Sequence, residues 1–177
     1  LNYNSKEIWN SGERINYFFG NFITRKKLGN SLNSSHELTE WFTGCCCLFK
    51  TKIFKDIGKL DERFFAYYED VDFSLRLKKY GYKIGFTSKT QIYHYESFSS
   101  ISNNSKGGKL SPYIHYLNIR NHILILKKHS DLFNSFGTRI YQIFKIISYS
   151  IYFIFRLRFI KLNMVYKGLL DSYKIKI

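Results

Sequence analysis

Apolar residues in the first part of the chain fall into short runs that predict strands and one helical turn. An alternation of polar and apolar residues over Glu13–Phe19 predicts a strand. The run Trp41–Phe49 is apolar and passes through Gly44, which predicts a buried strand. Thr51–Ile57 predicts a short helical turn, and Gly58 is placed to close it.

The pattern changes to helical spacing at Glu69. Apolar residues follow it at helical intervals, and Gly81 predicts the end of this helix. Tyr82–Phe86 and Gln91–Tyr95 predict two short strands, and Tyr113–Lys128 predicts a second helix. Strands and helices in this mixture predict the α/β class.

A long apolar segment, Ile140–Ile160, is interrupted by charged residues. A membrane span needs about 20 apolar residues, and this segment has that length but carries charges near its end and one inside. The pattern favours an amphipathic helix on a membrane surface, with Lys145, Arg156, Arg158 and Lys161 reaching toward lipid headgroups. The alternative is a helix that packs against a partner absent from the chain.

The composition is strongly basic. Twenty-eight Lys and Arg residues stand against 13 Asp and Glu, for a net charge of +15, which attracts phosphate groups. No nucleic-acid-binding motif accompanies these residues, so an anionic membrane surface is favoured as a partner and nucleic acid is not expected. The three cysteines are consecutive, Cys45–Cys47, which excludes spaced zinc ligands and favours small buried residues in a reducing compartment.

Three carboxylates gather at the start of the predicted helix: Glu69, Asp70 and Asp72. Acidic residues are common at a helix N-terminus, and Asp72 with Arg76 has the spacing of an ion pair along a helix. The cluster is nevertheless flanked by aromatic residues, which desolvate carboxylates and suit them to accept protons near neutral pH. His94 follows on a predicted strand, and a neutral imidazole can complete a divalent-metal site.

These segments together resemble a known family. The ordered motifs are TGCCCLFK, IGKLDERFFAYYEDVDFSLRLKKYGYKI, IYHYESFSS and NIRNHILILKK, over about residues 41–128. They resemble the C-terminal half of family-2 glycosyltransferases, especially bacterial rhamnosyltransferase-like members of cell-wall or polysaccharide biosynthesis. The resemblance implies a GT-A fold and an inverting transfer from a nucleotide-sugar donor to a glycan or lipid-linked acceptor.

The resemblance also implies roles for individual residues. Asp70 would be the base that deprotonates the acceptor hydroxyl, and Glu69 would orient the acceptor. His94 would help to hold a divalent cation, Mn or Mg, on the donor pyrophosphate. Trp41 and Gly44 would lie on the acceptor floor. The remaining site candidates are Asp72, Arg76, Arg120 and Asn121, of which the last two match an Arg-Asn pair without a specified role.

The sequence departs from the family pattern in one respect. No Asp-x-Asp motif, which holds the donor's metal, occurs upstream of residue 61. We therefore expect residues 1–40 to connect from a missing donor-binding half, 41–130 to form the acceptor-side catalytic part and 131–177 to form an amphipathic helical tail. The isolated segment is expected to be inactive and peripheral to the cytoplasmic face of the membrane. The alternative function is a non-catalytic, basic module that binds membrane surfaces.

Overall fold

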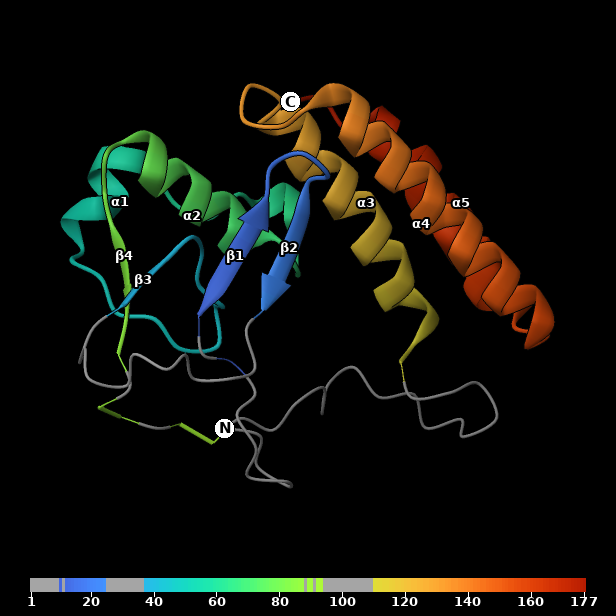
Figure 1. Cartoon of the computed structure of the whole chain (residues 1–177), viewed down its shortest axis with the longest axis horizontal. Helices are drawn as coiled ribbons and strands as arrows, with labels where there is room; N and C mark the ends of the chain where they lie inside the picture. Colours follow the sequence, from blue (N-terminus) through green and yellow to red (C-terminus); the bar gives the residue numbers. More distant parts are fainter. Residues whose placement is uncertain (1–9, 11, 25–36, 88, 91, 94–109) are drawn as a thin grey trace. The chain divides into compact units, whose positions relative to one another are not determined.

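The computed structural model describes residues 10, 12–24, 37–87, 89–90, 92–93 and 110–177. It separates into two compact units. Unit 1 contains the described residues of 1–16, 21–65 and 69–96, and unit 2 contains those of 17–20, 66–68 and 97–177. The elements in chain order are β1 (Glu13–Asn16), β2 (Asn21–Thr24), β3 (Glu37–Thr39), α1 (Lys52–Ile57), a 3-10 turn (Glu62–Phe64), α2 (Glu69–Lys79), β4 (Ile84–Phe86), α3 (Pro112–Lys128), α4 (Ser135–Phe155) and α5 (Phe159–Lys174) (Figure 1).

Unit 1 combines two small antiparallel sheets with two helices. β1 pairs with β2, and β3 pairs with β4, so that Leu38 lies opposite Gly85. The helices α1 and α2 bury Ile57, Phe73 and Leu77 in a common core, against which several half-buried aromatic side chains pack. Unit 1 therefore has a hydrophobic core of its own, and its mixture of strands and helices confirms the predicted α/β class at this level.

Several predicted elements of unit 1 are confirmed. The helical turn before Gly58 is α1, and Gly58 closes it at φ 79°, where a residue with a side chain would be strained. The carboxylate helix is α2, and Gly81 follows it at φ 80°. The strand predicted over Tyr82–Phe86 is β4, shortened by two residues.

The buried strand predicted over Trp41–Phe49 is wrong. The segment contains a turn at positions 44–46 and no strand, and Cys45–Cys47 are exposed free thiols. The aromatic residues near its ends supply the apolar signal: Trp41 is buried, and Phe42 and Phe49 pack against Phe73. The middle turns outward because the backbone of Gly44 binds a carboxylate, as described below.

Unit 2 is built on the three long helices α3, α4 and α5, which lie side by side (Figure 1). Ile119, Ile123, Phe153 and Val165 form its core, with at least one residue from each helix. α3 and α5 are closely packed at Gly168, where an added Cβ would lie 2.6 Å from the backbone oxygen of Tyr116. The absence of a side chain at this position permits the close packing.

The long helix predicted over Ile140–Ile160 is two helices, because the chain breaks between α4 and α5 with Leu157 at φ 52°. Two of the cations expected at lipid headgroups point elsewhere. Lys145 hydrogen-bonds to the ring of His122, and Lys161 is buried and donates to the carbonyl of Leu110 at 2.6 Å. No helix in the described part of the chain is both long and apolar enough to cross a bilayer.

Candidate functional site

The carboxylate of Asp70 is held in place by two backbone N–H groups. Asp70 lies in the first turn of α2, and its Oδ2 accepts a hydrogen bond of 2.9 Å from the N–H of Gly44. Its Oδ1 accepts one of 2.8 Å from the N–H of Val71. Burial raises the pKa of Asp70 above its ordinary value, and these two hydrogen bonds oppose that rise. The result is an oriented carboxylate that is more basic than an exposed aspartate.

Glu69 is the neighbouring carboxylate, and it is less constrained. Burial raises its pKa, and the negative charge of Asp70 adds to the effect. One of its oxygens, Oε2, is buried and makes no hydrogen bond to any described residue. A buried carboxylate oxygen without a donor is costly, so this atom is suited to accept a hydrogen bond from a ligand hydroxyl.

Among the described residues, Asp72, unlike Asp70 and Glu69, is bonded to an arginine side chain. Its side chain is fully buried and accepts a hydrogen bond of 2.9 Å from Nε of Arg76, the ion pair that the spacing predicts. The same guanidinium donates to the carbonyls of Ile57 and Lys59 at 2.5 and 2.8 Å. Asp72 and Arg76 thus fasten α2 to the end of α1, beside the site rather than in it.

Trp41 and Gly44, the two predicted acceptor-floor residues, differ in exposure. Trp41 is only 7% exposed, and its indole N–H donates to the carbonyl of Arg14 at 3.3 Å. Gly44 is exposed, and its N–H reaches Asp70. Of the two, only Gly44 presents a surface to a ligand, and it also orients the predicted base.

Sequence reasoning missed a polar cluster on β1. Glu13 is 3% exposed, and its carboxylate accepts hydrogen bonds from the side chains of Asn10, Thr39 and Thr43. Burial raises its pKa, and the charge of Asp70 contributes to the rise. A single glutamate in a polar stretch gives no sequence signal of this kind, because its three partners come from separate segments. The cluster anchors Thr43, the residue before Gly44.

Unit 2 contains the segment that immediately precedes Glu69 in the chain. Tyr67 and Tyr68 have φ values of 67° and 72°, which is uncommon for residues with side chains and implies stored strain. Asn121 is fully buried, and its amide nitrogen donates to the carbonyls of Ala66 and Tyr67, both at 2.8 Å. Arg120 in turn donates to the amide oxygen of Asn121 at 2.8 Å, which fixes the orientation of the amide. The Arg-Asn pair therefore holds this strained segment.

His122 extends the same network. Its ring stacks on Tyr68, and its Nε2 donates to the carbonyl of Gly20 at 2.7 Å. Its Nδ1 then accepts hydrogen bonds of 2.9 Å from Gln142 and Lys145 on α4. Burial lowers the pKa of His122 well below its usual value and lowers that of Lys145 to about 8.

The predicted metal ligand, His94, lies outside the described residues, as do two more of the five residues of the strand predicted to carry it, Gln91 and Tyr95. Among the described residues, no group of three His, Cys, Asp or Glu side chains is arranged to hold a metal ion. The described residues therefore do not supply a metal site by themselves. What they supply is an oriented, basic carboxylate with a second carboxylate beside it, an arrangement that can remove a proton from a bound hydroxyl group.

Comparison with known proteins identifies the class. The family model for glycosyl transferase family group 2 matches residues 8–107, more than half of the chain. An N-acetylglucosaminyl-diphospho-decaprenol L-rhamnosyltransferase of Mycobacterium tuberculosis is 33% identical over 69 residues, which are 39% of this chain and 22% of the relative. The O-antigen biosynthesis protein RfbC of Myxococcus xanthus is 34% identical over 67 residues, 34% of this chain and 5% of that protein.

The chain thus spans about a fifth of the length of the mycobacterial relative that it matches. No solved structure matches it. The matched family is the one that the ordered motifs resemble, so the predicted resemblance and enzyme class are confirmed.

Proposed function

This chain belongs to glycosyl transferase family group 2, and we propose that it forms the acceptor side of an inverting enzyme with a GT-A fold. The reaction would move a sugar from a nucleotide-sugar donor to a glycan or lipid-linked acceptor. The observation that carries the proposal is the carboxylate of Asp70, which is oriented by the N–H groups of Gly44 and Val71 and made more basic by burial.

In the proposed reaction Asp70 accepts the proton of an acceptor hydroxyl group. The hydroxyl oxygen then bonds to the anomeric carbon of the donor sugar from the face opposite the nucleotide. The bond from that carbon to the nucleoside diphosphate breaks, and the diphosphate leaves with the bonding electrons. Glu69, with one buried oxygen unsatisfied among the described residues, would accept a second hydrogen bond from the acceptor and orient it.

The relatives support a particular type of chemistry. The mycobacterial protein is named as a rhamnosyltransferase that acts on a lipid diphosphate, and the second relative is named for O-antigen biosynthesis. From these relatives we propose that this chain takes part in a rhamnosyltransferase-like reaction of bacterial cell-wall or polysaccharide synthesis. A divalent cation, Mn or Mg, with His94 among its ligands, remains a proposal that rests on the family resemblance. It is tested by whether His94→Ala raises the metal concentration that half-activates the full-length enzyme.

We place the protein at the cytoplasmic face of the membrane, attached by its helical tail. The support is a stripe of exposed apolar side chains along α4, here called the α4 stripe. It occupies positions that recur every three or four residues and so lie on one face of the helix. Its members are 45–83% exposed and comprise Phe136, Ile140, Ile143, Phe144, Ile147, Ile151, Ile154 and Phe155.

The test of the catalytic proposal is Asp70→Asn in the full-length protein. Asparagine keeps the shape and can still accept the Gly44 hydrogen bond, but it cannot take up the proton. Transfer should fall by about 100- to 10,000-fold, while donor binding and thermal stability change little. Asp72→Asn is the matched control: it should lower the melting temperature, because it weakens the bond to Arg76, and leave turnover within a few-fold. Near-normal turnover in Asp70→Asn would remove the residue from this role.

A further inference from the structure

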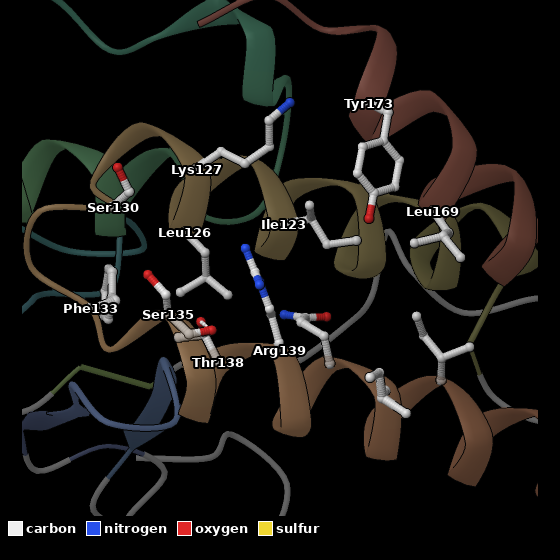
Figure 2. Close-up of a pocket in the computed structure, with 13 residues that line it drawn as sticks. Ile123, Leu126, Lys127, Ser130, Phe133, Ser135, Thr138, Arg139, Leu169 and Tyr173 are labelled. Carbon is white, nitrogen blue, oxygen red and sulfur yellow. Dashed lines mark hydrogen bonds between the residues drawn. The ribbon is translucent and has the colours of Figure 1, made fainter.

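Unit 2 contains a groove that the proposed transfer reaction does not use. It lies between the C-terminal half of α3, the N-terminal half of α4 and the C-terminal half of α5, and its volume is about 650 Å³ (Figure 2). This volume falls within the usual range for small-molecule sites. Apolar side chains dominate its walls, chiefly Ile123, Leu126, Ile143, Ile146 and Leu169.

A cationic side chain enters this apolar groove. Figure 2 shows Arg139 extending from α4 toward α3, into the space between the helices. Among the described residues, none makes a hydrogen bond or ion pair with its guanidinium. The second cation, Lys127, is engaged at the far wall, where it donates to the carbonyls of Ser172 and Ile175 at 3.1 and 3.5 Å. None of the described residues that line the groove is acidic.

The charge and the walls point to one kind of ligand. A free guanidinium presents a planar set of donors that matches a phosphate group, and the other charged residue that lines the groove, Lys127, is also a cation. The apolar walls match a hydrocarbon chain rather than a second polar group. Ile143 lines the groove and is also 59% exposed on the α4 stripe, so the groove adjoins the surface proposed to face the bilayer.

We propose that this groove binds a lipid phosphate, with the phosphate on Arg139 and the hydrocarbon chain along Leu126, Ile143 and Ile146. Such a ligand has two sources, a phospholipid of the bilayer or the isoprenoid phosphate of a lipid-linked acceptor. The second source deepens the proposed function and rests on it, whereas the binding site itself does not. A binding measurement therefore separates failure of this inference from failure of Asp70 as the base.

The experiment is a calorimetric titration of the full-length protein with soluble ligands below their micelle concentrations. Farnesyl phosphate represents the isoprenoid source and dihexanoyl phosphatidic acid the bilayer source. Farnesol lacks the phosphate, and inorganic phosphate lacks the chain. At least one of the two lipid phosphates should bind at least tenfold more tightly than farnesol and inorganic phosphate, and the tighter of the two identifies the source.

Variants test whether Arg139 is the anchor. Arg139→Gln should weaken binding of the lipid phosphate about tenfold, the loss expected for one charged hydrogen-bonding group. Arg139→Lys keeps the charge but not the planar donors, so its affinity should lie between those of the native protein and Arg139→Gln. Arg14→Gln is the matched control, since it removes the same charge at an exposed position of unit 1. Equal losses in Arg139→Gln and Arg14→Gln, or binding of farnesol or inorganic phosphate as tight as that of the lipid phosphates, would overturn the inference.

Discussion

At the scale of single residues, the acidic block of α2 separates into three environments. Asp72 is fully buried and bonded to Arg76, so it serves the packing of α2. Among the described residues, the carboxylate of Asp70 is bonded only to backbone N–H groups, which leaves lone pairs on its oxygens for a ligand. Glu69 keeps a buried oxygen without a described partner. Side chains at most three positions apart thus differ in burial and hydrogen bonding because their partners come from different segments.

Asn121 is the residue through which unit 2 holds the segment before Glu69. Asn121→Ala leaves the carbonyls of Ala66 and Tyr67 without their donor, and the strained backbone at Tyr67 and Tyr68 gains freedom. We expect kcat to fall about ten- to a hundredfold with a smaller change in KM, because small displacements of reacting groups slow chemistry more than binding. The unfolding free energy should fall by about 1–3 kcal/mol. Steady-state kinetics and thermal melts measure both.

The control for that variant is Asn134→Ala. Asn134 caps α4, where its side chain accepts from the N–H of Gly137 at 2.8 Å, and it has no bond to residues 66–68. Its loss should cost about 1 kcal/mol of stability and leave kcat unchanged. If both variants lowered kcat in proportion to their melting temperatures, Asn121 would have only a general structural role.

At the scale of elements, local sequence patterns predicted the helices and turns that depend on residues close together in the chain. The glycine ends of α1 and α2 and the span of α3 follow from residues within each helix. The exposed turn at positions 44–46 could not be predicted, because it involves the hydrogen bond between Gly44 and Asp70, which are 26 residues apart. Glu13 was missed for the same reason, since two of its partners lie 26 and 30 residues away.

The inward side of α4 also could not be predicted from local sequence. Its pattern predicts a lysine at the membrane surface, whereas Lys145 binds Nδ1 of His122 on α3. Burial lowers the pKa of Lys145 from 10.5 to about 8. Between pH 8 and 10.5 the unfolded chain therefore binds this proton more strongly than the folded protein does, and folding becomes more favourable as pH rises through that window.

The lowered pKa of Lys145 predicts how the stability of the protein changes with pH. Lys145→Met removes the titration, so the stability of the native protein relative to this variant should increase from pH 8 to pH 10.5, by at most about 3 kcal/mol. Urea unfolding of both proteins at several pH values measures the difference. Lys55→Met, at an exposed position on α1, is the control for removing a lysine. A native-to-variant difference that stays constant or shrinks with pH would contradict the burial of Lys145.

At the scale of the whole molecule, the basic charge and the apolar tail must be considered separately. The net charge is +15, but two tail cations expected at headgroups are turned inward, and Arg158 lies over the ring of Tyr152. The surface left on the tail is therefore more apolar than the sequence suggests. Membrane attachment should depend on the α4 stripe first and on charge second.

The prediction is that two substitutions on the α4 stripe, Phe144→Asp with Ile151→Asp, release the full-length protein from anionic vesicles. Each native side chain is more than half exposed, and burying one contributes about 1.5–3 kcal/mol. Leu48→Asp with Leu60→Asp is the matched control, because it adds the same charge at exposed apolar positions of unit 1. In flotation assays the native protein and the control should float alike and the stripe variant should not. Rising salt should remove only part of the native binding, since each arginine near an anionic surface contributes only about 1 kcal/mol while apolar burial is insensitive to screening. Equal flotation of all three proteins would exclude the stripe as the attachment surface, and complete release of the native protein by salt would show that charge alone holds it there.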